Sequence, residues 1–452
     1  MNESPALNSL RGSRGHLLKV LGVGFGLAVI IGNTVGAGIL RTPGEIAQWL
    51  PTNSLFLGVW VAGGVYALLG AISLAELGTA IPCSGGQYIF ARRGLGEYAG
   101  FVVGWSDWLS SAGTTAAVSI LVGDYVVALF PVLHNQSIKI ALFLTLAFAL
   151  FQWRGVNWGS RIQNSTSSIK GLLFILFVIA AFVFGRGDST PALIPEKTLV
   201  AVPIGIGLFR ALQSVIYTYD GWNGVIYFSE EVRDPSRNIT RSMLGGVVLV
   251  IGLYLLVNVS LLYVMPLSRF AGSDLAIGTA ANVVFGARGD TIIRIIMVVS
   301  LISSLNAFQL MTSRVLFAMS RDGLFLKAGS KVNQGGTPTV SLFISTMVSV
   351  AFILTGTFAK VLALLAFFFV ANYTISFITL FVLRVREPNL ARPYRAWGYP
   401  WTTGIVLAGS IAFLASAIHG DRENSLYALA VLLISYPVFV AIKRIQKYDP
   451  LK

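Results

Sequence analysis

The sequence predicts an all-α membrane protein with twelve transmembrane helices, and three observations support this. The mean hydropathy of the 452-residue chain is +0.75, and 55% of its residues are hydrophobic. Only 12% are Asp, Glu, Lys or Arg, about half the charged share of a soluble domain. The apolar residues also gather in long runs. A soluble globule could not bury this much apolar surface, so the chain is expected to lie in a lipid bilayer.

Twelve runs are apolar and long enough to cross a bilayer, which takes about 20 helical residues. They are 20–49, 54–80, 98–130, 138–153, 162–185, 202–228, 242–264, 291–319, 339–356, 359–383, 402–418 and 425–442. The first, third and eighth runs are long, which indicates tilt or a break. The runs form a first group of five helices at 20–185, a second group of five at 202–383 and two further helices at 402–442. Polar segments lie at the two ends of the chain, 1–19 and 443–452.

Lysines and arginines are unevenly distributed between the two sides of the predicted membrane. The side that carries both termini holds about twice as many as the other, and the positive-inside rule places it in the cytoplasm. We therefore expect a multi-pass protein of the inner or plasma membrane with cytoplasmic termini. The segment 230–234, on the same side, is expected to be a solvated face of mixed charge.

The charged and metal-ligating residues exclude several classes of protein. The net charge is +14, but the basic residues sit in short gaps between apolar runs, and nucleic-acid binders gather them on one face. The chain has one cysteine, Cys83, and three widely separated histidines, His16, His134 and His419. Because acid, base and metal ligands are not clustered, no nucleic acid, metal, cofactor or enzymatic activity is expected.

The middle of the first run is rich in small and polar residues. Gly32, Gly36 and Gly38 flank Asn33 and Thr34, and each glycine costs a helix about 1 kcal/mol relative to alanine. This favours an unwound segment at membrane depth, which is tolerated only where protein covers it or it lines a cavity. The alternative is a packing face, because closely spaced small residues also allow helices to approach each other.

The sixth run carries an acidic residue at membrane depth. Asp220 is followed by Gly221 and preceded by Tyr217 and other polar residues. A carboxylate there costs about 2.5 kcal/mol or more, which indicates a functional site; the alternative is a structural cap of a half-helix. Broken helices at matching positions of two helix groups are typical of transporters. Their free N–H and C=O groups suit the carboxylate and ammonium of a zwitterion.

Several motifs together resemble the amino acid–polyamine–organocation (APC) superfamily, and most closely its L-type branch, which includes the light chains of heteromeric amino-acid transporters. The similar segments lie in the family's order along most of the chain. They are Gly36–Ile39 with Thr42 and Pro43, Glu76–Thr79, Ser84–Tyr88, Tyr219–Asn223, Glu230–Pro235, Ser313–Arg314 and Ser320–Gly323. The resemblance implies a five-plus-five inverted repeat with broken helices 1 and 6, and two extra helices.

The resemblance also implies which residues bind the substrate: Thr34, Gly36, Ala37, Gly38, Tyr217, Asp220 and Asn223. Ala37 and Gly38 match the turn whose amides bind the substrate carboxylate. The carbonyls of Thr34, Tyr217 and Asp220 match positions that face the amino group. Tyr217 also matches an aromatic gate, and Asn223 matches a polar pocket residue.

Lys170 lies inside the fifth run, where a lysine is costly unless it has a partner. One reading is that its ammonium snorkels to the interface. In similar sodium-independent permeases, a lysine here takes the place of a sodium ion. The resemblance then implies that Lys170 bridges the first helix near Gly32 to the eighth helix near Ser303 or Ser304, and it argues against sodium coupling.

The sequence departs from the human light chains in one respect. Those chains carry a cysteine in the second outer loop that links them to a heavy chain, and residues 131–137 contain none. No disulfide-linked heavy subunit is therefore expected.

The leading functional hypothesis is a sodium-independent secondary transporter, a permease or exchanger, that carries amino acids by alternating access. Neutral amino acids are expected as main substrates and cationic ones as second, because Asp220 would attract a second positive charge. The alternative is a proton-coupled transporter of cationic amino acids or polyamines. A different class remains open as well, an amino-acid-sensing membrane protein or a channel.

Overall fold

The structure is a computed structural model that describes residues 17–185, 203–355, 358–420 and 422–447. Most of the predicted N-terminal segment, at 1–16, lies outside the described residues. The basic residues Arg186 and Lys197 and the end of the predicted tail, at 448–452, also lie outside them.

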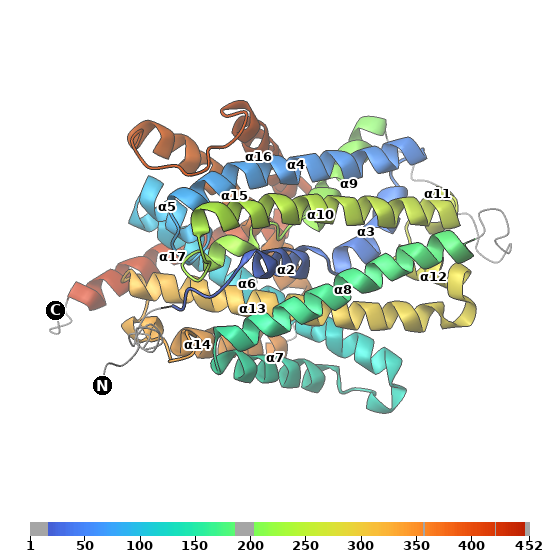
Figure 1. Cartoon of the computed structure of the whole chain (residues 1–452), viewed down its shortest axis with the longest axis horizontal. Helices are drawn as coiled ribbons and strands as arrows, with labels where there is room; N and C mark the ends of the chain where they lie inside the picture. The colour runs from blue at the N-terminus through green and yellow to red at the C-terminus, as the bar shows by residue number, and fades with distance from the viewer. Residues whose placement is uncertain (1–16, 186–202, 356–357, 421, 448–452) are drawn as a thin grey trace, which may run out of the picture.

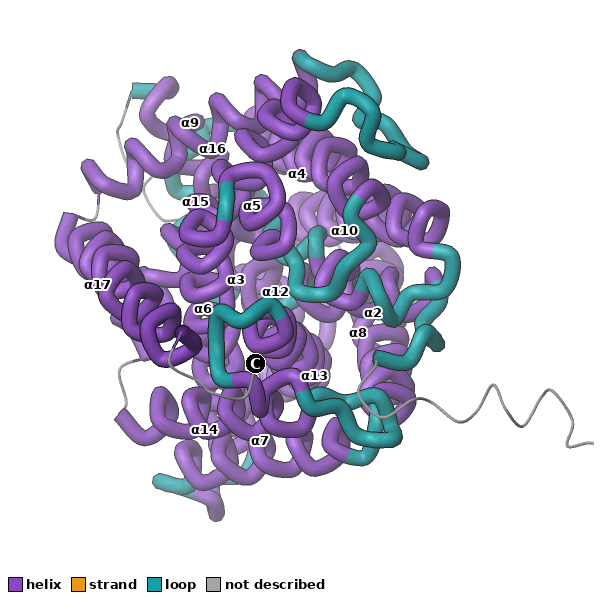
Figure 2. The backbone as a smooth tube through the Cα atoms, turned by 90° about the vertical axis from the view of Figure 1, so that its left-hand side faces the viewer, coloured by secondary structure: helices purple, strands orange, loops and turns teal. Residues whose placement is uncertain are grey.

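The described residues form helices joined by loops, without a named strand (Figure 2). The α-helices are α2 (Val23–Thr34), α3 (Ala37–Ala47), α4 (Asn53–Ala80), α5 (Gln87–Leu95), α6 (Glu97–Leu129), α7 (Ser137–Trp153), α8 (Val156–Phe184), α9 (Ile204–Thr218), α10 (Pro235–Val264), α11 (Leu267–Phe270), α12 (Ala276–Phe285), α13 (Gly289–Arg321), α14 (Thr339–Thr355), α15 (Phe358–Arg386), α16 (Trp401–Gly420) and α17 (Arg422–Lys447). Short 3₁₀ turns are η1 (Pro131–Leu133), η2 (Gly224–Phe228), η3 (Gly286–Arg288) and η4 (Lys327–Ser330).

Eight of the described helices are long and apolar enough to cross a membrane, or nine if α2 and α3 count as one bent span. Three shorter apolar helices, α7, α9 and α14, coincide with the remaining predicted runs. The all-helical architecture is thus confirmed. Helices α5, α11 and α12 were not predicted, because they lie in connections between the apolar runs.

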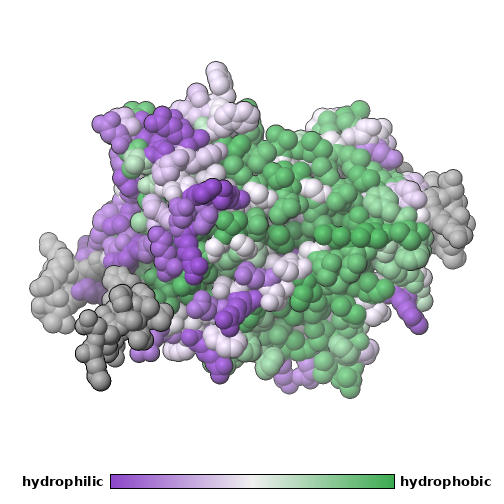
Figure 3. Space-filling model, viewed as in Figure 1, coloured by the Kyte–Doolittle hydropathy of each residue, from purple (hydrophilic) through white to green (hydrophobic). Residues whose placement is uncertain are grey.

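The surface of the molecule has the pattern expected of a membrane protein. Several long helices, including α4, α8 and α10, run side by side along the longest axis (Figure 1). Hydrophilic residues gather at one end of the visible face, and hydrophobic residues cover most of the rest (Figure 3). Large apolar side chains such as Leu150, Leu172 and Val183 are exposed. In water such a patch would be unfavourable, whereas lipid tails solvate it.

The interior is organised around α6 and α13, which pack against each other over much of their length. Both are continuous helices of 33 residues, so their predicted extra length reflects long helices without a break. In α13, nearly every residue from Ser303 to Ser320 is buried. Helices α7, α14 and α17 lie further from the centre (Figure 2).

The first span is broken. Helix α2 ends at Thr34, α3 begins at Ala37, and their axes differ by 44°. The break lies at Val35 and Gly36, and Gly32 is still helical. A Cβ at Gly32 would lie 2.1 Å from Gln163 Nε2, so the packing interpretation is correct for this glycine.

The sixth span also stops inside the molecule. Helix α9 ends at Thr218, and the chain passes through a turn into η2. Gly221 has a φ of +105°, and a Cβ there would lie 2.7 Å from Asn33 Cβ and 3.0 Å from Thr34 N. Only glycine tolerates both that backbone conformation and that approach. The two breaks therefore touch each other.

Candidate functional site

The two breaks line a cavity of about 1010 Å³. Thr34, Gly36, Ala37, Gly38, Tyr217 and Asp220 from the predicted site all lie on its wall, together with Ser304. Asn223 is 4% exposed and is not part of that wall. The cavity extends past the exposed side chains of Arg41 and Glu45 on α3 to the segment 272–274.

The N-terminus of α3 faces the cavity. Gly36 is its N-cap and supplies no side chain to cap the helix, and the first four N–H groups of a helix have no partner within the helix. These amides and the helix dipole favour an anion at this position. The small side chains of Ala37 and Gly38 leave the backbone accessible.

Carbonyl groups lie on the other side of the breaks, and Tyr254 of α10 ties two of them together. Its hydroxyl lies 2.6 Å from Thr34 O and 3.1 Å from Thr218 O. The carbonyl of Tyr217 accepts from the Asp220 amide at 3.1 Å. A carbonyl oxygen has two lone pairs, so Thr34 O can accept one further bond, whereas Tyr217 O also accepts from the Tyr219 amide. Tyr254 was missed in the sequence because a single tyrosine in an apolar run is not distinctive.

The Asp220 side chain is held by α15. The Tyr373 hydroxyl lies 2.5 Å from Asp220 Oδ1 and 3.3 Å from Asn223 Oδ1. The Tyr373 ring stacks on Trp222, with a centroid distance of 5.0 Å. Asp220 also accepts a hydrogen bond from the Gly221 amide. It therefore stabilises the broken segment, in line with the alternative that Asp220 has a structural role.

Asp220 lines both the large cavity and a small one of about 30 Å³, and Tyr217, Phe369 and Phe413 also border both. Aromatic side chains dominate the wall of this second cavity, namely Tyr66, Tyr217, Trp222, Phe369, Tyr373, Phe377 and Phe413. A carboxylate therefore stands between the helix breaks and an apolar aromatic chamber.

Lys170 of α8 is fully buried, so the snorkelling interpretation is wrong. Its Nζ lies 2.9 Å from Gly32 O, 2.6 Å from Val35 O and 3.3 Å from Ser304 Oγ. Both carbonyls belong to the C-terminal end of α2, where the helix dipole stabilises a positive charge. Lys170 thus bridges the first helix to α13, as the resemblance implied.

The serines of α13 near Lys170 make different hydrogen bonds. Ser304 donates to Gly32 O at 2.6 Å, and Ser300 donates to Val35 O at 3.1 Å. Ser303 instead lies 2.9 Å from the Ser167 hydroxyl, which donates to Ala28 O at 2.6 Å. Ser303 therefore stabilises the α2–α8–α13 junction without contacting Lys170.

The end of the molecule away from the cavity mouth is closed by a buried ion pair. Arg314 of α13 binds Glu231 at 2.9 Å and 3.1 Å, and both side chains are fully buried. Glu231 also accepts from Leu21 N through its carbonyl, at 2.8 Å. Burial raises the pKa of Glu231, and the Arg314 guanidinium opposes that rise. The expectation that 230–234 is only a solvated face is wrong, because α13 and the start of the first span cover Glu231.

Further contacts surround this pair, and we refer to residues 84–88, 228–233 and 314–322 with Leu21 as the closed end. Ser84 and Glu230 exchange two hydrogen bonds of 3.1 Å. Tyr88 donates to Asp322 at 3.0 Å. These contacts join segments that follow the second, sixth and eighth predicted spans.

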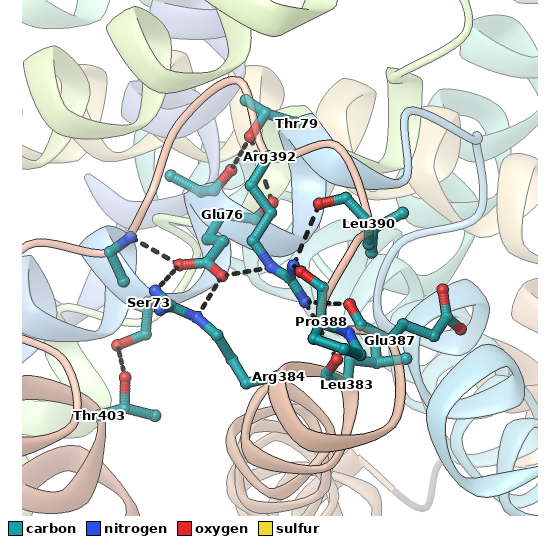
Figure 4. Close-up of polar contacts among 12 residues, drawn as sticks. Ser73, Glu76, Thr79, Leu383, Arg384, Glu387, Pro388, Leu390, Arg392 and Thr403 are labelled. Carbon is teal, nitrogen blue, oxygen red and sulfur yellow. Dashed lines mark hydrogen bonds and ion pairs between the residues drawn. The ribbon is translucent and has the colours of Figure 1, made fainter.

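Glu76, part of one resembling motif, lies away from the cavity. It is fully buried and binds Arg384 through two bonds of 2.7 Å and 2.6 Å (Figure 4). Arg392 approaches it at 3.0 Å, and the Ala396 amide donates to it at 2.6 Å. Glu76 thus fastens the connection between α15 and α16 onto α4.

Comparisons with known proteins agree with this geometry. A family model described as amino acid permease matches residues 25–440. The serine/threonine exchanger SteT of Bacillus subtilis (strain 168) is 26% identical over 433 residues, 95% of this chain and 98% of its own. The b(0,+)-type amino acid transporter 1 of Homo sapiens is 27% identical over 92% of this chain and 86% of its own.

A third relative, the Asc-type amino acid transporter 1 of Mus musculus, is 28% identical over 84% of this chain and 73% of its own. The family match covers both breaks, the cavity between them and segments 84–88, 228–233 and 314–322 of the closed end. The chain therefore belongs to the amino acid permease family of the APC superfamily, as a multi-pass membrane transporter of amino acids and not an enzyme.

Proposed function

We propose that this permease is a sodium-independent secondary transporter that carries mainly neutral amino acids by alternating access. The observation that carries the proposal is the cavity at the two breaks, with helical amides at one edge and carbonyl groups at the other. A zwitterion matches both edges at once. Lys170 holds the end of α2 with an ammonium, which is where the resemblance places a cation in the ion-coupled relatives.

The proposal includes a topology. Twelve spans form two inverted groups, 20–185 and 202–383, followed by two helices at 402–442, with both termini in the cytoplasm. In support, each of the twelve predicted runs coincides with a described helix or broken pair. No disulfide-linked heavy subunit is proposed, since Cys83 precedes Ser84 at the closed end, on the proposed cytoplasmic side.

Alternating access is supported by the difference between the open end of the cavity, along α3, and the closed end. The cavity is open along α3 and closed at the other end by the Glu231–Arg314 pair. Carrying substrate across requires this closed end to separate while the mouth near 272–274 closes. A channel would need neither step.

The substrate range is testable through Asp220. In vesicles, we expect excess arginine to compete with labelled alanine or leucine for uptake, but more weakly than neutral amino acids do. Asp220→Asn removes a charge-assisted hydrogen bond worth about 1.5–3 kcal/mol, so arginine should bind about ten- to a hundredfold more weakly. Neutral uptake in the same variant is the internal control.

The competition assay also separates the alternatives. If arginine does not compete in the wild type, mixed specificity is ruled out. If cationic amino acids or polyamines are the only substrates, the alternative transporter is correct. If vesicles take up no labelled amino acid, a sensor or channel replaces the proposal.

Gly38→Val tests the proposed carboxylate site. A Cβ at Gly38 would lie 3.1 Å from Thr218 Cγ2, and the two extra methyl groups would fill the space next to the α3 amides. Overpacking costs about 1–3 kcal/mol, so we expect about ten- to a hundredfold weaker substrate binding with normal membrane insertion. Gly58→Val on α4, where a Cβ meets nothing within 4 Å, is the matched control. Unchanged uptake in Gly38→Val would remove this turn from the site.

A further inference from the structure

Asp107 of α6 is an acidic residue that the proposed function does not use. It is 1% exposed and lies within the long apolar span Glu97–Leu129. The Tyr227 hydroxyl donates to Asp107 Oδ1 at 3.1 Å. The Ser111 hydroxyl faces the same carboxyl from one turn along α6, but Oδ2 has no hydrogen-bond partner among the described residues.

No cation balances this carboxyl group within the described part of the chain. Asp107 makes no ion pair there, whereas the buried carboxylates of Glu76 and Glu231 each bind arginine. A carboxylate buried without a partner is costly, and it relieves the cost by binding a proton. An ionisable residue inside a membrane protein is a functional hypothesis by default, and proton relays are a common role.

The elements around Asp107 supply few other charges. Asp220 and Tyr373 face it from the sixth span and α15. Tyr88 of α5 packs one turn away at Gly104 and is bonded to Asp322. The remaining described charged side chains on the packed helices are paired or lie near helix ends. The paired ones are Arg314 with Glu231, Lys443 with Glu97, Arg92 and Arg321 with Asp322, Arg93 with Glu387, Arg294 with Asp290 and Arg384 with Glu76. Arg386 and Arg444 lie near the ends of α15 and α17, and Lys139 lies at the start of α7.

A track of polar side chains connects Asp107 to the substrate cavity. Asp220 stands on the cavity wall and binds the Tyr373 hydroxyl. Tyr373 contacts Asn223, and Asn223 faces the Tyr227 hydroxyl that binds Asp107. The wall of the cavity is thus joined to a buried carboxyl group through hydroxyl and amide groups.

The same tyrosine packs against the closed end. A Cβ at Gly86 would lie 2.4 Å from the Tyr227 ring, and the Gly85 amide donates to Tyr227 O at 3.3 Å. When segments 84–88 and 228–233 separate, the cover over Tyr227 and Asp107 is removed. Separation of these segments would therefore let water reach Asp107 by a route other than the polar track.

We propose that Asp107 is a proton-binding site that couples amino-acid transport to the movement of protons. With the cavity open, the carboxylate takes a proton from water through the polar track and becomes a neutral carboxylic acid. With the closed end open, it releases that proton to water on the other side. This inference rests on the proposed function, and it is compatible with sodium independence.

Proteoliposomes with an alkaline interior test the coupling. If one proton accompanies each neutral amino acid, a gradient of about one pH unit is worth about 1.4 kcal/mol and drives about tenfold accumulation. Asp107→Asn keeps an oxygen that can accept from Tyr227 but cannot titrate, so accumulation should be lost. It should still bind amino acid in a thermal-shift assay, because Asp107 does not line the cavity. Asp124→Asn, an exposed aspartate at the far end of α6, should accumulate substrate like the wild type.

Infrared difference spectroscopy tests the site independently of transport. On acidification, the spectrum of the wild type minus that of Asp107→Asn should contain the carbonyl stretch of one protonated carboxyl group, because the other Asp and Glu side chains titrate in both proteins. Tyr227→Phe should keep that band, because it leaves the carboxyl group in place, but should lose accumulation.

Two results would overturn the proton site. One is accumulation by Asp107→Asn equal to that of the wild type. The other is wild-type exchange of amino acids without accumulation on a pH gradient, which would leave the proposed function intact. If the wild type neither binds nor transports any amino acid, the proposed function fails. The infrared titration then decides alone, and identical carboxyl bands in the wild type and Asp107→Asn refute the assignment.

Discussion

Lys170→Ala is expected to reduce amino-acid uptake to the background of empty vesicles. The change removes the ammonium that holds Gly32 O and Val35 O at the break of the first span. Gly32 O and Val35 O would keep their serine donors on α13, but each would lose a hydrogen bond to a charged group, worth about 1.5–3 kcal/mol. The end of α2 would then be held less firmly against α8 and α13, and the amides and carbonyls of the site would lose their alignment.

The control for this variant is Lys139→Ala, which removes an exposed lysine at the start of α7 and should leave uptake unchanged. If the Lys170 ammonium takes the place of a coupling cation, as proposed, wild-type uptake should also be the same in sodium, potassium or choline buffers. A steep sodium dependence of the wild type would disprove this role of Lys170, and so would normal uptake by Lys170→Ala.

Breaking the Glu231–Arg314 pair is expected to have the largest effect on stability. Both side chains are fully buried, and removing one partner of such a pair costs about 3–5 kcal/mol because an uncompensated charge stays buried. We therefore expect Glu231→Gln to lower the midpoint of thermal unfolding strongly. The double variant Glu231→Leu with Arg314→Met should recover much of the loss, since an apolar pair of similar size carries no buried charge.

The same pair is expected to control access to the closed end, and Cys83 reports on it. Cys83 is the single cysteine and precedes Ser84, which binds Glu230. Burial raises the pKa of its thiol, and nearby Glu230 adds to the rise, so the reactive thiolate is scarce while the end is closed. Glu231→Gln should therefore speed maleimide labelling of Cys83.

Glu387→Gln is the matched control for these experiments. Glu387 pairs with Arg93 at 2.7 Å, with side chains 34% and 39% exposed, and the guanidinium lowers the pKa of the carboxyl. Exposed pairs contribute about 0–1 kcal/mol, so stability and labelling should barely change. Equal effects of both glutamine variants would show that the buried pair has no special part in closing this end.

The spans and the positions of the two breaks could be predicted from the sequence, because both are local properties. A bilayer selects long apolar runs, and glycines and an aspartate inside such runs stand out against them. The partners of Lys170 near Gly32 and Ser304 were also correct. The sequence could not predict whether Ser303 or Ser304 contacts Lys170. Consecutive residues on a helix point about 100° apart, and only the packing of α13 against α2 decides which serine faces the lysine.

The sequence by itself therefore determined that this chain is a helical membrane transporter with two interrupted spans and a lysine inside the membrane. Only the tertiary structure decided that Glu231 is buried against Arg314, that Tyr254 and Tyr373 hold the breaks and that Asn223 lies off the cavity wall. It also decided that Asp107 is buried without a cation among the described residues. The physical reason is that these properties depend on contacts between segments far apart in the chain. Glu231 and Arg314 are 83 residues apart, and Asp107 and Tyr227 are 120. Hydropathy and glycine spacing describe each segment alone, whereas burial and charge pairing exist only once the helices pack together.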